Sequence, residues 1–122
     1  MVILALDLGV RRIGVAVNPT GGALVLELPT IRVDDIGQVL GTVRELVGRY
    51  QAERILVGTT YAQETASLLS ALQASAGVPV LTIDEALTTK EAERQFAQEG
   101  QSGDTDARAA RLILEQYIRE VR

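Results

Sequence analysis

Residues 1–17 of the chain are MVILALDLGVRRIGVAV, two apolar runs separated by a short polar turn. A single charged residue, Asp7, interrupts the first run, Met1 to Leu8, and such a run is typical of a strand buried on both faces. The second run, Ile13 to Val17, is rich in β-branched residues and follows a turn that begins at Gly9. The stretch therefore predicts an antiparallel pair of strands with an acid at the end of the first.

Downstream of this pair, the pattern predicts one more adjoining strand and then alternating helices and strands. Capping residues, apolar periodicity and glycines set the expected bounds: a strand over Ala23–Arg32 with Pro29 at an edge, a helix from Asp34 or Asp35 to Tyr50, a strand over Arg54–Gly58, a helix from the Thr60–Gln63 capping box to Gly77, a strand over Val78–Ile83, a helix from the Thr88–Glu91 box, and a last helix from about Asp106. The fold class is α/β: one domain over residues 1–122, with a mixed five-stranded sheet of three antiparallel and then two parallel strands, flanked by helices.

Composition limits the available chemistry. The 122 residues contain neither cysteine nor histidine, which excludes thiol catalysis, imidazole bases and His- or Cys-ligated metals. The formal net charge is −4, so a protein that coats nucleic acid through general charge is not expected. Any catalysis must use carboxylates, hydroxyls, arginines or a hard metal ion. We expect a cytoplasmic chain without a membrane span, because no apolar run approaches about 18 residues.

Acidic residues occupy three places where burial makes them costly. Asp7 ends the first strand, the pair Asp84-Glu85 ends another, and Asp106 opens the last helix on the stripe that faces the sheet. Ligands of open α/β sheets bind beyond the carboxyl ends of strands, where both strand acids lie. Converging carboxylates repel one another unless a cation is present, and oxygen ligands suit Mg²⁺ or Mn²⁺. The pattern thus predicts a metal site.

Each acid also has a purely structural explanation. Asp7 can close the turn at Gly9, Asp84 or Glu85 can cap the helix after Thr88, and Asp106 can favour a helix N-terminus. The turn after Asp7 leaves a further alternative open. A strand acid followed by glycine also resembles the phosphate loop of actin- and sugar-kinase-type nucleotide-binding domains.

Four pieces of the sequence resemble one known family. The run DLGVRRIGVAV from Asp7 to Val17 is similar to the opening signature of the YqgF/RuvX family, nucleases of RNase H-like fold related to Holliday-junction resolvases. Three further pieces follow in the family's order: Ile55-Leu56-Val57-Gly58, Asp84-Glu85-Ala86-Leu87-Thr88-Thr89, and Asp106-Ala107-Arg108-Ala109-Ala110. Together they span essentially the whole chain.

The resemblance implies a metal-dependent nuclease that hydrolyses phosphodiester bonds, in 5′-end processing of pre-16S rRNA or in cleavage of branched DNA. It implies Asp7, Glu85 and Asp106 as catalytic residues, and the same three with Asp84 as ligands of Mg²⁺ or Mn²⁺. We expect substrate phosphates to contact a local basic rim of Arg11, Arg12, Lys90 and Arg108. The expected partners are RNA or structured DNA, with a homodimer allowed. The alternatives are a non-catalytic nucleic-acid-binding module and the nucleotide-binding domain above.

The chain departs from the family pattern at three places. Thr59-Thr60-Tyr61 replaces the usual Leu-Pro and longer polar loop, Ala86 replaces an arginine, and Gln101 to Thr105 replaces a basic stretch. All three changes reduce the surface expected to contact substrate and leave the expected metal ligands in place.

Overall fold

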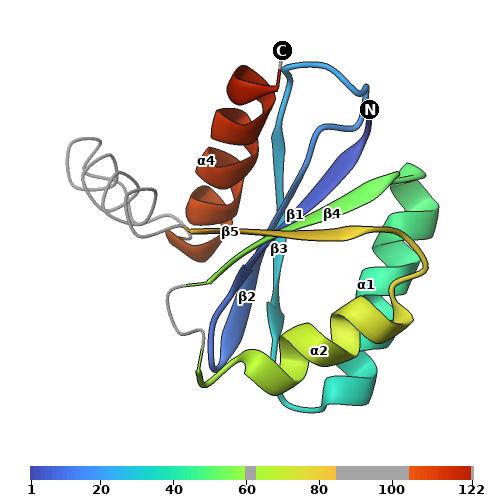
Figure 1. Ribbon diagram of the computed structural model, residues 1–122, viewed down its shortest axis with the longest axis vertical. Coiled ribbons are helices and arrows are strands. Elements are labelled where there is room, and N and C mark those ends of the chain that lie inside the picture. Colours follow the sequence, from blue (N-terminus) through green and yellow to red (C-terminus); the bar gives the residue numbers. More distant parts are fainter. Residues whose placement is uncertain (60–62, 85–104, 122) are drawn as a thin grey trace.

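The computed structural model describes residues 1–59, 63–84 and 105–121, with the backbone alone at Thr59, Asp84 and Thr105. Its elements follow the predicted order (Figure 1): β1 (Ile3–Leu8), β2 (Arg12–Val17), β3 (Leu26–Arg32), α1 (Ile36–Tyr50), β4 (Arg54–Thr59), α2 (Ala66–Ser75), β5 (Val80–Asp84) and α4 (Thr105–Glu120). The helix expected after Thr88 falls outside the described residues.

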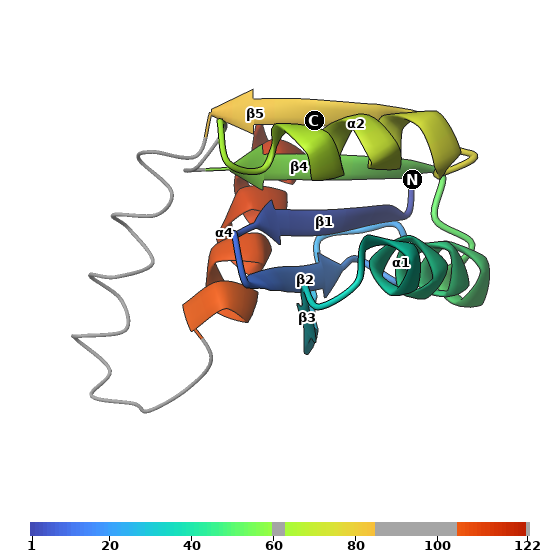
Figure 2. The ribbon, with the colours of Figure 1, turned by 90° about the horizontal axis from the view of Figure 1, so that it is seen from below.

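The strands form one five-stranded sheet in the order β3-β2-β1-β4-β5 (Figure 2). β1 pairs with β2 and β2 with β3 in antiparallel fashion, whereas β4 runs parallel to both β1 and β5. The predicted fold class is therefore confirmed. Because β1, β4 and β5 are parallel, their carboxyl ends meet at one edge of the sheet.

Helices cover both faces of the sheet, and the alternation of side chains along β1 separates two cores. Leu4, Leu6 and Leu8 pack against buried residues of α1 and α2. Ile3 and Ala5 face the other way and pack against residues of α4. α4 covers this face of the sheet (Figure 1). Asp7 continues this second row, so its position in the strand directs it to the α4 face.

The sequence predicts the start of α1 correctly and the start of α2 wrongly. Asp35 caps α1 as expected: its carboxylate accepts a hydrogen bond of 2.8 Å from the Gly37 N–H. The prediction that the Thr60–Gln63 box opens α2 is wrong, because α2 begins at Ala66. Residues 63–65 form a turn, and a helical hydrogen bond runs from the Leu69 N–H to the Thr65 carbonyl.

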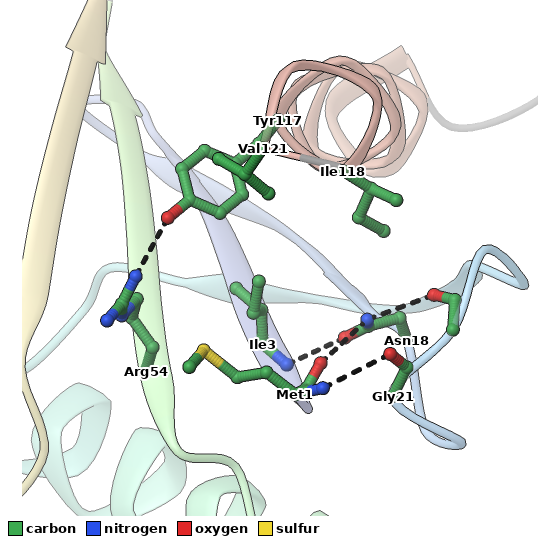
Figure 3. Close-up of a pocket in the computed structure, with 9 residues that line it drawn as sticks. Met1, Ile3, Asn18, Gly21, Arg54, Tyr117, Ile118 and Val121 are labelled. Carbon is green, nitrogen blue, oxygen red and sulfur yellow. Dashed lines mark hydrogen bonds between the residues drawn. The ribbon is translucent and has the colours of Figure 1, made fainter.

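A buried asparagine holds the opposite end of the sheet. Asn18, only 1% exposed, accepts a hydrogen bond from the Ile3 N–H (2.6 Å) and donates to the carbonyls of Met1 and Gly22 (Figure 3). Its amide therefore ties the start of β1 to the loop that follows β2. The turn pattern after Val17 marked a loop here but gave no sign of this three-way contact.

We expect Asn18→Ala to lower the free energy of unfolding by about 2–3 kcal/mol, because truncation leaves the buried Ile3 N–H and two part-buried carbonyls without their partner. Urea denaturation of both proteins measures this loss. Asn18→Asp is the matched variant: it keeps the acceptor for Ile3 and loses both donors, so it should also be destabilised. Wild-type stability in both variants would mean that water replaces the amide.

None of the helices in the described segments is long and apolar enough to cross a membrane.

Candidate metal centre

Asp7 lies in a row of residues across the sheet in which both of its direct neighbours are glycine, called the glycine row below. Its neighbours in the strand register are Gly14 on β2 and Gly58 on β4, and the next position on β5 is Ile83. Glycine on both sides means that no side chain of a neighbouring strand stands beside the Asp7 carboxylate. Asp7 is half-buried, at the carboxyl end of β1 where ligands of such sheets bind.

The start of α4 rests directly on this row. A Cβ atom added to Gly14 would overlap the main-chain carbonyl oxygen of Asp106, so glycine alone permits this approach of helix to sheet. Gly14 is the direct cross-strand partner of Asp7, about 5 Å away at the ordinary strand spacing. The close packing at Gly14 therefore brings Asp106 next to Asp7, although the two acids are far apart in sequence.

Arg12 supplies positive charge to this cluster. Its Nε lies 3.2 Å from the Asp106 Oδ2, and the two side chains are 67% and 31% exposed respectively. Arg12 is the first residue of β2, and the main-chain hydrogen bond from the Gly9 N–H to the Arg12 carbonyl (3.0 Å) fixes the turn before it. Two acids and one guanidinium thus meet at the edge where the parallel strands end.

The other predicted site residues are distributed as follows. Asp84 forms the last backbone position of β5, beside Thr59 at the same edge. Arg11 is exposed, and its carbonyl accepts a hydrogen bond from the Val33 N–H. Arg108 is only 7% exposed, so it is not part of the exposed cationic surface that Arg11 and Arg12 form. Glu85 and Lys90 lie outside the described residues.

The donor chemistry at this edge fits a hard divalent cation. Asp7 and Asp106 offer carboxylate oxygens, the ligands that Mg²⁺ and Mn²⁺ prefer, and the glycine row leaves space beside Asp7. Within the described ranges, however, no three acids are grouped closely enough to hold a metal ion. The described part thus offers two candidate carboxylates, Asp7 and Asp106, for such an ion.

Sequence reasoning missed two residues of this region. Gly14 was noted only as part of the signature, because its contact with α4 depends on tertiary packing. Arg32 lies directly opposite Arg12 in the β2–β3 register, which places both arginines on one face of the sheet. The only signal for Arg32 was its position at the end of the third strand.

A pocket lies at the other end of the sheet, where the carboxyl-terminal half of α4 faces the start of β1. Its volume is about 420 Å³, and Arg54 donates a hydrogen bond of 2.8 Å to the Tyr117 hydroxyl in its wall (Figure 3). None of the described residues that line it is an acid. Its described lining therefore lacks the carboxylates found around Asp7.

The sequence profile of RuvX, described as Holliday junction resolvase, matches residues 1–120. The chain belongs to the RuvX family. A RuvX relative from Syntrophus aciditrophicus, named "Putative pre-16S rRNA nuclease", is 33% identical over 97% of this chain and 88% of its own. One of the same name from Synechococcus elongatus is 33% identical over 98% and 89%. The first alignment spans 132 positions against 122 residues, so the relative carries residues that have no counterpart here.

Solved structures agree with the RuvX assignment at the level of the fold. RuvC of Thermus thermophilus, in complex with a Holliday junction substrate, matches with a TM-score of 0.65 at 20% identity, over 98% of this chain and 96% of that one. The Fowlpox virus resolvase bound to Holliday junction DNA matches with a TM-score of 0.59 at 12% identity, over 99% of both chains. The fold is thus the RNase H-like fold of these resolvases.

Proposed function

We propose that this RuvX chain is a divalent-metal-dependent nuclease that hydrolyses phosphodiester bonds. The observation that carries the proposal is the contact of α4 with Gly14, which brings Asp106 beside Asp7 at the carboxyl edge of the parallel strands. The names of the relatives support a nuclease. They favour it over a non-catalytic binding module or a kinase-type nucleotide-binding domain.

In such a reaction the acidic residues bind the metal ion and the arginines bind the substrate. Asp7 and Asp106 hold the ion, with Glu85 as the third ligand and Asp84 as its neighbour, on the strength of the family signature. When bound, Mg²⁺ or Mn²⁺ supplies the positive charge that activates water and stabilises the leaving oxygen. The chain has no histidine, so no imidazole base is available to act in its place. Arg11 and Arg12 are exposed at the same edge and contact substrate phosphates.

For the substrate we propose the 5′ leader of pre-16S rRNA, with branched DNA as the second candidate. The relatives' name supports the RNA. Two structural neighbours were solved with Holliday junctions bound, so branched DNA is tested together with the RNA. Because the net charge is −4, we expect phosphates to bind local arginines rather than the surface as a whole. We place this activity in the cytoplasm, without a membrane partner.

Cleavage of end-labelled RNA tests the proposal. We expect products from pre-16S leader RNA, and from a four-way junction if branched DNA is also a substrate, in Mg²⁺ or Mn²⁺. We expect none in EDTA or in Ca²⁺, because the acids here have no other way to activate water. Single-stranded DNA of the same length is the substrate control.

Full activity in EDTA would rule out the metal mechanism. Binding of structured RNA with no cleavage in any metal would instead favour the non-catalytic module.

A further inference from the structure

The ion pair between Arg12 and Asp106 conflicts with a metal-binding role for Asp106. In the described geometry the Arg12 Nε is 3.2 Å from the Asp106 Oδ2, an oxygen that a bound cation would need. A guanidinium and a divalent ion on one carboxylate also repel each other. A metal ion therefore has to compete with the Arg12 guanidinium for the Asp106 carboxylate.

Because the Arg12 side chain is exposed to water, its ion pair with Asp106 should weaken metal binding only slightly. The Arg12 side chain is 67% exposed, and pairs as open as this contribute little to stability because water screens the charges. Its main chain, in contrast, is fixed by the turn at Gly9 and by pairing with β3. Arg12 can thus release Asp106 by rotating its side chain, without moving the sheet.

A second arginine is the cross-strand neighbour of Arg12. Arg32 lies opposite Arg12 in the strand register, and its Nε is 3.9 Å from the Asp34 Oδ2 with both side chains largely exposed. Two guanidiniums on adjacent strands at one edge offer planar donor groups to a phosphate. Arg12 also shares a face of β2 with Gly14, the neighbour of Asp7 in the glycine row.

We propose that Arg12 is an exchangeable counter-ion: a divalent cation displaces it from Asp106, and the freed guanidinium then binds a nucleic-acid phosphate beside Arg32. The inference rests on the proposed function, since it needs a metal at Asp106. It makes metal binding and nucleic-acid binding mutually strengthening.

Metal affinity is the first test. The melting temperature is followed against Mn²⁺ concentration, without nucleic acid, for the wild type, Arg12→Gln and Arg49→Gln. Arg49 pairs with Glu45 on α1, away from the glycine row, so its loss controls for net charge. We expect Arg12→Gln to bind Mn²⁺ about twofold to fivefold more tightly than the wild type, because its competitor is gone. Arg12→Lys, which keeps the charge, should stay near the wild type.

Binding of a fluorescent four-way DNA junction is the second test, in Ca²⁺ and in EDTA. We expect Ca²⁺ to strengthen binding by the wild type about threefold more than binding by Arg12→Gln, because the metal frees the guanidinium only in the wild type. The comparison is a ratio of ratios, so the charge lost in both conditions cancels.

Unchanged or weaker Mn²⁺ binding by Arg12→Gln would overturn the competition. Equal strengthening by Ca²⁺ in both proteins would overturn the transfer to phosphate. A wild-type protein with no saturable response to Mn²⁺ would instead remove the metal site, and with it the proposed function. The three failures are therefore distinguishable.

Discussion

Replacing Asp7 with asparagine should abolish cleavage while leaving the metal-free protein at least as stable as the wild type. Asparagine keeps the shape of the side chain and removes one of the charges gathered around the glycine row. Loss of a metal ligand should reduce the rate by at least about a thousandfold, since metal catalysis is worth several kcal/mol. Relief of repulsion from Asp106 should stabilise the apoprotein by up to about 1 kcal/mol.

Differential scanning fluorimetry with and without Mn²⁺, together with the RNA cleavage assay, measures both effects of Asp7→Asn. The variant should lose most of the thermal protection that Mn²⁺ gives the wild type. Glu45→Gln, on the exposed surface of α1, removes a charge elsewhere and should keep both properties. If Asp7 serves only the turn at Gly9, the melting temperature should fall and cleavage should persist.

Replacing Gly14 with alanine should damage the fold and the site together. The new Cβ would overlap the Asp106 carbonyl, and main chain on both sides leaves no flexible side chain to move away. We expect a loss of about 2–3 kcal/mol in the free energy of unfolding, as for an overpacked core. The start of α4 should be displaced from β2, and cleavage should be lost even at temperatures where the variant is folded.

Gly41→Ala is the matched control for Gly14→Ala. Gly41 lies inside α1, and a Cβ there would meet nothing within 4 Å. Alanine should therefore stabilise the helix by about 0.5–1 kcal/mol and leave cleavage unchanged. Urea denaturation in EDTA, paired with the cleavage assay, separates the two glycines. A Gly14→Ala protein of normal stability and activity would show that α4 can shift without consequence.

Much of the fold followed from local sequence signals. The apolar run ending at Asp7 and the cap at Asp35 predict β1 and the start of α1, because burial on both faces and helix capping act over a few neighbouring residues. The start of α2 was mispredicted for the same reason. Thr60 and Gln63 have the spacing of a capping box, but residues 63–65 form a turn and the helix begins at Ala66.

The candidate site was predictable in its acids and not in its packing. Asp7 and Asp106 stand out because charge at a buried strand end or on an inward helix stripe is costly. The contact at Gly14, the ion pair of Arg12 with Asp106 and the position of Arg32 beside Arg12 join residues distant in sequence, so no local pattern reveals them. The burial of Arg108 likewise depends on tertiary packing, and its contact with substrate remains a prediction.

The contact of α4 with β2 also sets when the two acids can first meet during protein synthesis. β1 and β2 leave the ribosome early, whereas α4 follows only after β4, α2 and β5 have been made. At typical rates of 5–20 residues per second, roughly 5–20 s separate the translation of Asp7 from that of Asp106. Until then Asp7 stands without its partner acid. A nascent chain whose synthesis has not yet reached Asp106, surrounded by ribosomal RNA, therefore cannot bring the two carboxylates together.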